Sequence, residues 1–180
     1  MSGDGVVIDR LDGASYAAAI PELAEVLIDC VDSGGGVSFM APLAPLDAIR
    51  FWLSLEGEVD THRKIVLAAR DAGGIAGTVQ LHPCWQPNQP HRAEVAKLLV
   101  HRRARRRGIA AALMARIEQE ARGLGRTLVT LDTETDGPAE TLYRGLGYQV
   151  AGRIPDFALM SHGGLTATTI LFKRLSPPAA

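Results

Sequence analysis

The chain has 180 residues, of which 47% are hydrophobic and 22% charged, and its formal net charge at pH 7 is -1. Such a composition is that of an ordinary globular protein, long enough for one domain with its own core and short for two. The near-neutral charge excludes a global attraction to nucleic acid or to an anionic membrane, so any basic function must be local.

Neither an export signal nor a membrane span is predicted. The N-terminal MSGDGVVIDR lacks the basic and apolar regions of a signal peptide, and no stretch approaches the roughly 18 apolar residues that a span requires. Cys30 and Cys84, the only cysteines, cannot form a disulfide framework or a four-ligand zinc site, and the histidines lack ligand spacing, so no metal is expected. The sequence therefore predicts a cytoplasmic protein, with a single domain over residues 1–175 and a disordered tail over 176–180.

The first half of the chain is predicted to contain a strand, two helices and a β-hairpin. Its elements are the strand 6–10, the helices 16–31 and 46–59, and the hairpin strands 64–69 and 75–81. In the first helix Pro21 is tolerable only near the first turn, because proline lacks the N–H that the interior of a helix needs. The hairpin is indicated by the DAGG turn between its two β-rich runs.

The second half alternates strands and helices. Its elements are the strand 93–100, the helix 108–122, the strand 127–131, the helix 138–146, and the strands 148–152 and 166–172. In the first of these strands Leu98, Leu99 and Val100 run together, which suggests either a strand covered on both faces or a bulge. Together the two halves predict a mixed α/β architecture with one sheet.

Five arginines gather in HRRARRRGIAAAL, residues 101–113, between the strand that ends near Val100 and the helix that begins near Gly108. A glycine at a helix start lets backbone N–H groups approach an anion, and arginines add forked donors, so the stretch suits a pyrophosphate. It is neither a Walker loop nor the dinucleotide fingerprint, since the further glycines and the Lys-Ser/Thr pair are absent. Nucleic acid is disfavoured because no aromatic residues alternate with the arginines. A solvated charged turn is the remaining alternative.

The pattern Arg105-x-x-Gly108-x-Ala110 resembles the acetyl-CoA pyrophosphate loop of the GNAT superfamily of N-acetyltransferases, and AETLYRGLGYQVAGRI, residues 139–154, resembles the family's helix-then-strand signature. A narrower resemblance, to tabtoxin-resistance acetyltransferases and their relatives, is carried by HRAEVAKLLV, LDTETDGPAETLY, GGGVSFMAPL and TATTILFKRL. The resemblance implies an α/β (α+β) fold with a single mixed, mostly antiparallel sheet of about six to seven strands flanked by four helices. It also implies acetyl-CoA as the co-substrate.

The resemblance implies that acetyl-CoA contacts a strand, the arginine loop and a helix. Backbone groups of the strand are expected to pair with the pantetheine amides, as a peptide adds to a sheet edge, and Ala139 would leave room for the sulfur. The expected cofactor-binding residues are Leu98, Leu99, Val100, Arg105, Arg106, Arg107, Gly108, Ile109, Ala110 and Ala139. One departure is Asp136, which stands where many members carry a cofactor-contacting asparagine, so that contact is not carried over. If Asp136 approached the pantetheine arm, its charge would need a partner.

Acetyl transfer to an amine needs a neutral amine and a protonated leaving thiolate. Glu94 and Asp132 are the expected catalytic carboxylates. The narrower resemblance implies that they hold the ammonium and act as bases that remove its proton. Tyr143 is the expected general acid, because a phenol with a pKa near 10 stays protonated and can donate to the thiolate. Each of these residues also has a non-catalytic alternative. Glu94 could be solvated or paired with Lys97, Asp132 could be an acid at a strand end, and Tyr143 could pack in the core.

The sequence thus predicts an N-acetyltransferase that acts on a primary amine of a small polar molecule, an amino acid or an antibiotic- or toxin-like compound, by direct attack in a ternary complex. Loops over 37–45, 82–91 and 157–165 would wall the acceptor pocket. The alternatives are a non-catalytic acyl-CoA-binding regulatory module, a protein or peptide N-acetyltransferase, and a nucleic-acid binder using Arg102 to Arg107. No nucleic acid or membrane is expected as a partner. The sequence does not predict the oligomeric state, and the resemblance implies a homodimer as one alternative, because pairs are common in the family.

Overall fold

The computed structural model describes residues 5–176 and contains one seven-stranded sheet with the strand order β1-β2-β3-β4-β5-β7-β6. In chain order the elements are β1 (Val7–Leu11), α1 (Gly13–Asp32), α2 (Pro45–Leu53), α3 (Glu56–Asp60), β2 (Ile65–Asp71), β3 (Gly74–Pro83), β4 (Arg92–Val100), the 3-10 helix η1 (Arg102–Ala104), α4 (Ile109–Gly123), β5 (Leu128–Glu134), α5 (Pro138–Gly145), β6 (Gln149–Leu159) and β7 (Leu165–Arg174). Except for Ser176, the tail expected over 176–180 lies outside the described residues.

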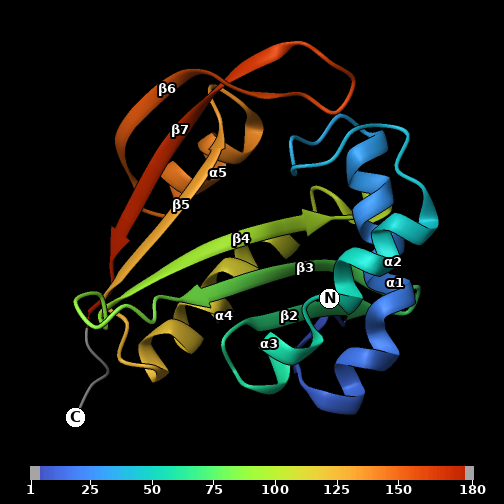
Figure 1. The fold of residues 1–180 in the computed structure, drawn as a ribbon, viewed down its shortest axis with the longest axis horizontal. Helices are drawn as coiled ribbons and strands as arrows, with labels where there is room; N and C mark the ends of the chain where they lie inside the picture. Colours follow the sequence, from blue (N-terminus) through green and yellow to red (C-terminus); the bar gives the residue numbers. More distant parts are fainter. Residues whose placement is uncertain (1–4, 177–180) are drawn as a thin grey trace.

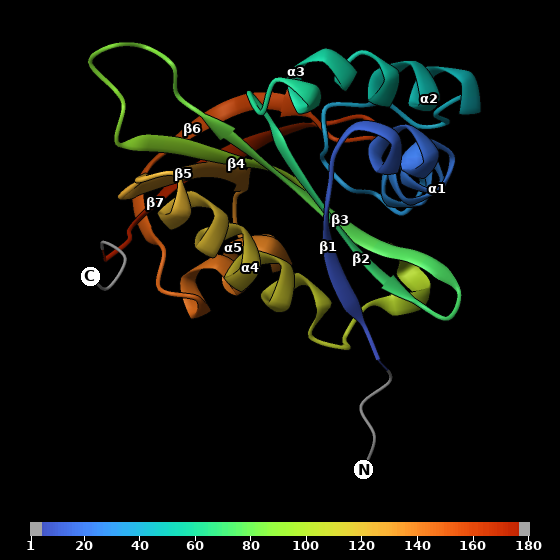
Figure 2. The ribbon, with the colours of Figure 1, turned by 90° about the horizontal axis from the view of Figure 1, so that it is seen from below.

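The sheet is mixed and mostly antiparallel, which confirms the expected fold class. Five of its strand pairs are antiparallel, and only β4 and β5 run parallel. Helices α4 and α5 cover one face, while α1, α2 and α3 cover the other (Figures 1 and 2). Within residues 5–176 no helix is long and apolar enough to cross a membrane.

The four expected helices are present, and the structure corrects two details of the first half. The helix expected over 46–59 is broken into α2 and α3, because the Ser54 hydroxyl bonds back to the Phe51 carbonyl at 2.7 Å while Leu55 turns into the core. Pro21 lies in the third turn of α1, because that helix begins at Gly13. The expectation that Pro21 needs the first turn was wrong, since the buried face of α1 outweighs the missing hydrogen bond.

The core consists of two layers, one on each side of the sheet. Alternate residues of β2 divide between them: Ile65 and Leu67 pack toward α4, and Val66 and Ala68 pack toward α1. This double coverage explains why β2 is an uninterrupted apolar run rather than an alternating one. It also makes the sheet a rigid support for residues that project from β3, β4 and β5.

Strand β4 contains a bulge, which decides between the two interpretations of its irregular sequence. Its register with β3 shifts between Thr78 and Gln80, and Lys97 has a positive φ of 51°. As a result Val95 lies in the α4 layer while Leu99 lies in the α1 layer, although residues two or four apart on a regular strand share a face. The bulge therefore re-aims the side chains of the last third of β4.

Strands β4 and β5 pair only at their beginnings. Their parallel register covers Arg92 to Glu94 against Leu128 to Thr130, and beyond these residues the two strands diverge (Figure 1). Strand β5 continues its pairing with β7 instead, through Glu134. The last part of β4 and the end of β5 are therefore not paired with each other, and helix α5 contacts β5 there. We call the place where the two strands separate the opening.

Candidate active site

Two acidic side chains lie on the α1 face of the sheet where β4 and β5 separate. Glu94 is opposite Thr130 in the parallel register, and Asp132 is the next residue of β5 on that same face. Glu94 is half-buried, and its side chain has neither a hydrogen bond nor an ion pair with another residue in 5–176. Asp132 is exposed and accepts a hydrogen bond from the Thr168 hydroxyl at 3.0 Å. Both carboxylates are therefore available to a cation at this opening.

Tyr143 reaches the same opening from helix α5. Its side chain is 6% exposed and its ring lies 5.8 Å from that of Tyr148. Burial, and then the nearby charge of Asp132, raise the pKa of the Tyr143 phenol above its usual value, so the group is protonated at neutral pH. Within the described residues no side chain or backbone group hydrogen-bonds to its hydroxyl. The phenol is thus a proton donor without a protein acceptor.

An uncapped helix start faces a cavity of about 230 Å³ next to the opening. Gly108 is the N-cap of α4, with φ of 77°, and no side chain caps the helix. The first backbone N–H groups of a helix have no intrahelical acceptor, and the helix dipole adds partial positive charge there. The cavity is lined by Val100, Ala104, Arg105, Arg106, Gly108, Ile109, Ala110, Ala111 and Leu142. This combination suits an anion such as a phosphate group.

Most of the arginine cluster is bound to the protein itself. Asp29 of α1 accepts from both the backbone N–H and the guanidinium of Arg102. Asp71 of the β2–β3 hairpin pairs with Arg103 and with Arg107, each at 2.8 Å. The hydrogen bond from Arg103 is the main reason that the pKa of Asp71 falls to about 2. Two acids from distant elements thus hold the loop in shape, a structural role that the sequence pattern alone did not indicate.

The remaining arginines differ in their freedom. Arg105 lines the cavity and donates to the Val100 carbonyl at 3.1 Å and to the Ser33 hydroxyl at 2.6 Å. Arg106 also lines the cavity, has φ of 65°, and forms no hydrogen bond or ion pair within residues 5–176. Arg107 does not line it and turns toward Asp71. Among the three arginines expected to bind the cofactor, Arg106 therefore has the side chain that is most available to a ligand.

The other expected cofactor residues lie around the opening. Val100, Gly108, Ile109 and Ala110 line the cavity, and Leu98 and Ala139 are partly buried against the α4 layer. Leu99 is buried in the α1 layer because of the bulge. The Val100 carbonyl is already used, since it accepts from Arg105 and also from the Cys30 thiol at 3.5 Å.

The charge of Asp136 has the partner that its position demands. The Arg153 guanidinium lies 2.8 Å from it and also 3.1 Å from Glu140. Glu140 is buried at the third position of α5, where its carboxylate accepts from the Asp136 backbone N–H at 2.8 Å and from the Thr169 hydroxyl at 2.9 Å. The Asp136 N–H is the main reason that the pKa of Glu140 is lowered. Glutamate three residues after Gly137 is a helix-start signal that could have indicated this role.

His82 is a site residue that sequence reasoning left unassigned. It lies directly opposite Glu94 in the β3–β4 register, and its Nε2 lies 2.9 Å from Gln80 Oε1. Burial is the main cause that lowers the pKa of His82 to about 4, so the imidazole is neutral at pH 7. The register of the hairpin, which the sequence did not fix, is what brings His82 beside Glu94.

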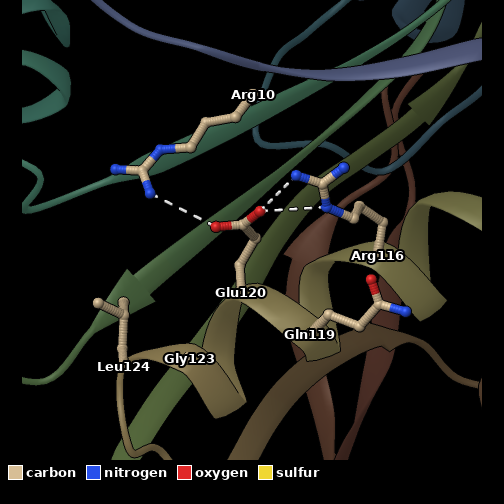
Figure 3. Close-up of a pocket in the computed structure, with 6 residues that line it drawn as sticks. All are labelled: Arg10, Arg116, Gln119, Glu120, Gly123 and Leu124. Carbon is tan, nitrogen blue, oxygen red and sulfur yellow. Dashed lines mark hydrogen bonds and ion pairs between the residues drawn. The ribbon is translucent and has the colours of Figure 1, made fainter.

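A larger cavity, of about 420 Å³, lies between β1 and α4 (Figure 3). It is separate from the opening between β4 and β5. Its charged groups satisfy one another: Glu120 is bound by Arg116 at 2.8 Å and by Arg10 at 3.4 Å. Elsewhere within residues 5–176, no group of three or more histidine, cysteine or acidic side chains is placed to hold a metal ion. The opening between β4 and β5 is therefore the best candidate for an active site.

The sequence model of the Acetyltransferase (GNAT) family matches residues 37–148, which include β4, the arginine loop, α4, β5 and α5. The chain belongs to this family. The GNAT chain is also 31% identical, over 129 residues, to a protein from Azospirillum brasilense described as an uncharacterised N-acetyltransferase in the hisH-hisA intergenic region, with 71% of this chain and 74% of the relative covered. Acetyl-CoA is the acetyl donor of GNAT enzymes.

Solved structures share the GNAT fold along nearly the whole chain. A Salmonella typhimurium protein assigned as an acetyltransferase and solved with acetyl-CoA has a TM-score of 0.76 at 17% identity, covering 98% of this chain and 97% of its own. A ribosomal-protein-alanine N-acetyltransferase from Brucella melitensis has a TM-score of 0.75 at 22% identity, covering 94% and 99%. A protein assigned as a phosphinothricin N-acetyltransferase has a TM-score of 0.76 at 18% identity, covering 94% and 99%. At these identities the likeness establishes the fold and leaves the acceptor open.

Proposed function

We propose that this GNAT protein acetylates a primary amine of a small polar molecule, an amino acid or an antibiotic- or toxin-like compound, by direct attack in a ternary complex with acetyl-CoA. The observation that carries the proposal is the pair of available carboxylates, Glu94 and Asp132, on one face of the opening. The protonated phenol of Tyr143 lies near Asp132 at that same opening. Two groups that can act as bases and one that can act as an acid therefore lie at the opening between β4 and β5.

The residues around the cavity fit the pyrophosphate of acetyl-CoA. The uncapped start of α4 supplies backbone donors, and Arg106 supplies a guanidinium that has no other partner within residues 5–176. We assign the pyrophosphate to Arg105, Arg106 and the residues from Gly108 to Ala110, and the pantetheine arm to the edge of β4 at Leu98 to Val100 and to Ala139. When bound, acetyl-CoA supplies a thioester whose acetyl group is transferred.

Glu94 and Asp132 would bind the acceptor as an ammonium and remove its proton. A free alkylammonium has a pKa of about 10.4, so it carries almost no neutral amine at pH 7 without such help. The nitrogen then bonds to the acetyl carbon as the carbon–sulfur bond breaks, and it loses its second proton to solvent to give the neutral amide. Tyr143 would give its proton to the departing sulfur and recover one from solvent. No acyl-enzyme is needed, which agrees with the buried, hydrogen-bonded position of Cys30.

Three further properties are part of the proposal. A cytoplasmic location rests on the two unpaired cysteines and on the lack of an export signal in the sequence, and a homodimeric state rests on the resemblance to the wider family. A role in resistance to an antibiotic or toxin that carries a primary amine rests on the narrower resemblance. We also propose that the domain extends over residues 1–175. Two GNAT structures bear the names of enzymes for phosphinothricin and for ribosomal-protein alanine, which illustrates that the fold accommodates both small and macromolecular acceptors.

An assay of CoA thiol release with a panel of amines tests the proposal. The rate without an amine is subtracted to correct for hydrolysis of acetyl-CoA. The panel would contain free amino acids, diamines, aminoglycosides, a peptide with a free N-terminus and a histone-like lysine peptide. We expect turnover with at least one small amine. Turnover confined to the peptides would assign the chain to protein acetylation. Tight CoA binding without turnover on any acceptor would favour the non-catalytic acyl-CoA module.

The anion site at the start of α4 gives a prediction about cofactor binding. We expect Gly108→Asp to weaken acetyl-CoA binding about tenfold or more, because it places a carboxylate beside the pyrophosphate. Gly108→Asn is the matched control: asparagine has nearly the same shape and also tolerates the positive φ of 77°, but it carries no charge. Calorimetric titration would measure both affinities. Equal affinity of Gly108→Asp and the parent chain would remove the loop from the binding site.

A further inference from the structure

Within residues 5–176, Lys97 is the lysine that has no carboxylate partner. The sequence contains only Lys64, Lys97 and Lys173. Lys64 lies 3.1 Å from Glu58, and Lys173 lies 2.8 Å from Glu118. Lys97 has no carboxylate within ion-pair distance in residues 5–176, and in particular it does not pair with Glu94. Partial burial of a cation costs hydration free energy, and without an anion nearby little electrostatic attraction offsets that cost.

The surroundings of the Lys97 ammonium are polar but neutral. Its Nζ donates to the Val37 carbonyl at 3.1 Å and to the Ser38 hydroxyl at 3.2 Å. It also lies 5.9 Å from the ring centres of both Phe39 and Phe51. An ammonium has three N–H donors, so one of them remains after these two hydrogen bonds. The group is therefore held in place and still able to bind an anion.

The bulge in β4 places the Lys97 side chain on the α1 face of the sheet, where Glu94 and Asp132 also lie. Lys97 and Val95 would share a face on a regular strand, which would send the lysine toward α4. At the bulge Lys97 has φ of 51° and its ammonium contacts the loop after α1 instead. Ser38, which binds that ammonium, has φ of 73°. Positive φ costs free energy in residues other than glycine, and such strain is concentrated at functional sites.

On this face Lys97 lies near the two acids proposed to bind the amine. Glu94 precedes it by three residues, a distance of roughly 10 Å along an extended strand, which two long side chains can span toward each other. Burial lowers the pKa of Lys97, and the negative charge of Asp132 partly offsets that effect, as expected for two groups that face the same space. The other charged or titratable groups that act on this space are His82 and Lys64, the latter already paired with Glu58.

We propose that Lys97 binds the carboxylate of the acceptor, so that the substrate is an amino acid carrying a free carboxylate rather than a simple amine or a polyamine. This inference rests on the proposed function, since Glu94 and Asp132 receive the ammonium end of the same molecule. A polyamine would bring a second cation toward Lys97, and a peptide N-terminus lacks a carboxylate next to its amine. The arrangement of charges therefore selects among acceptors that the two acids alone would accept equally.

Matched acceptors test the assignment directly. Lysine and lysinamide, and likewise alanine and alaninamide, differ in whether the carboxylate is free. Acetylation by the parent chain, by Lys97→Met and by Lys97→Arg would be followed with saturating acetyl-CoA. Binding of each acceptor to the protein saturated with CoA would be measured by calorimetry, which needs no turnover. We expect the parent chain to prefer at least one free acid about tenfold or more in kcat/KM and in affinity.

Lys97→Met should lose this preference through a raised KM for the acid, whereas Lys97→Arg should keep most of it because the charge remains. Absence of any preference in the parent chain would overturn the inference even if Lys97→Met failed to fold. An unchanged preference in a folded Lys97→Met variant, or an equal fall of kcat for acid and amide, would also overturn it. Turnover of amines without regard to the carboxylate would leave the proposed function intact. Preferential binding of the acid without any acetylation would instead keep the carboxylate site and overturn the proposed function.

Discussion

Replacing Tyr143 with phenylalanine is expected to lower kcat about 100-fold or more while acetyl-CoA affinity stays the same. The substitution keeps the ring, which packs against Tyr148, and deletes only the hydroxyl. Since that hydroxyl has no hydrogen-bond partner within residues 5–176, its removal should not destabilise the fold. Steady-state kinetics with an accepted amine, together with calorimetric titration of acetyl-CoA, would separate the two effects.

Tyr148→Phe is the matched control for this experiment. Its buried hydroxyl lies near Glu118 rather than Asp132 and makes no hydrogen bond of good geometry within residues 5–176, so its loss should leave both the fold and turnover nearly unchanged. Because the pKa of Tyr143 is raised, the phenol should also stay protonated throughout the working range, and a loss of activity at alkaline pH should not be due to it. Turnover of Tyr143→Phe at the parent rate would reduce Tyr143 to a packing residue.

Neutralising Glu94 or Asp132 should weaken the binding and deprotonation of the acceptor rather than the binding of the cofactor. We expect Glu94→Gln and Asp132→Asn each to lower kcat/KM for the amine about 10- to 100-fold, the usual contribution of a hydrogen bond to a charged group. The loss should take the form of a higher KM or an upward shift of the pH–rate profile, because less of the ammonium would be deprotonated at a given pH. Affinity for acetyl-CoA should remain nearly intact.

The control for the acids is Asp9→Asn, which neutralises an exposed carboxylate on β1, at the far edge of the sheet. It changes the net charge by the same amount and should leave the kinetics unaltered. If Glu94 and Asp132 contact the same ammonium, the double variant should lose less than the product of the two single losses. Single variants that behave like Asp9→Asn would show that these acids are solvated residues of the strand and strand end.

Local patterns in the sequence were sufficient for much of the fold. Alternating and helical apolar spacing predicted the start of every strand of the sheet within one residue, and the DAGG turn marked the β2–β3 hairpin. The end of β6 was wrong: the strand was expected to end at residue 152 and reaches Leu159, so that residues 157–159 of an expected loop belong to it. Almost all of this edge strand is exposed, so it lacks the apolar alternation on which the prediction depended. Gly108, at a positive φ before an amphipathic helix, marked the start of α4. These features depend on residues close together in the chain, which is why a single sequence contains them.

Errors arose where distant contacts overrode local preference. Nothing local indicated that α1 would continue through Pro21, because the compensation comes from burial of its face against the sheet. The break between α2 and α3 likewise depends on Leu55 entering the core. In each of these places the free energy of burial was larger than the propensity on which the prediction rested.

By itself the sequence determined that this protein has a mixed sheet, an arginine-rich loop that resembles the pyrophosphate loop of the GNAT family, and acidic and phenolic side chains in the neighbouring elements. Only the tertiary structure decided how these groups are arranged. Asp29 and Asp71, remote in the chain, bind most of the arginine cluster, and the bulge in β4 turns Lys97 toward the face of Glu94. Ion pairing and strand register are set by contacts between segments far apart in sequence, so residue type and spacing predict which groups are present but not which of them remain free to bind a substrate.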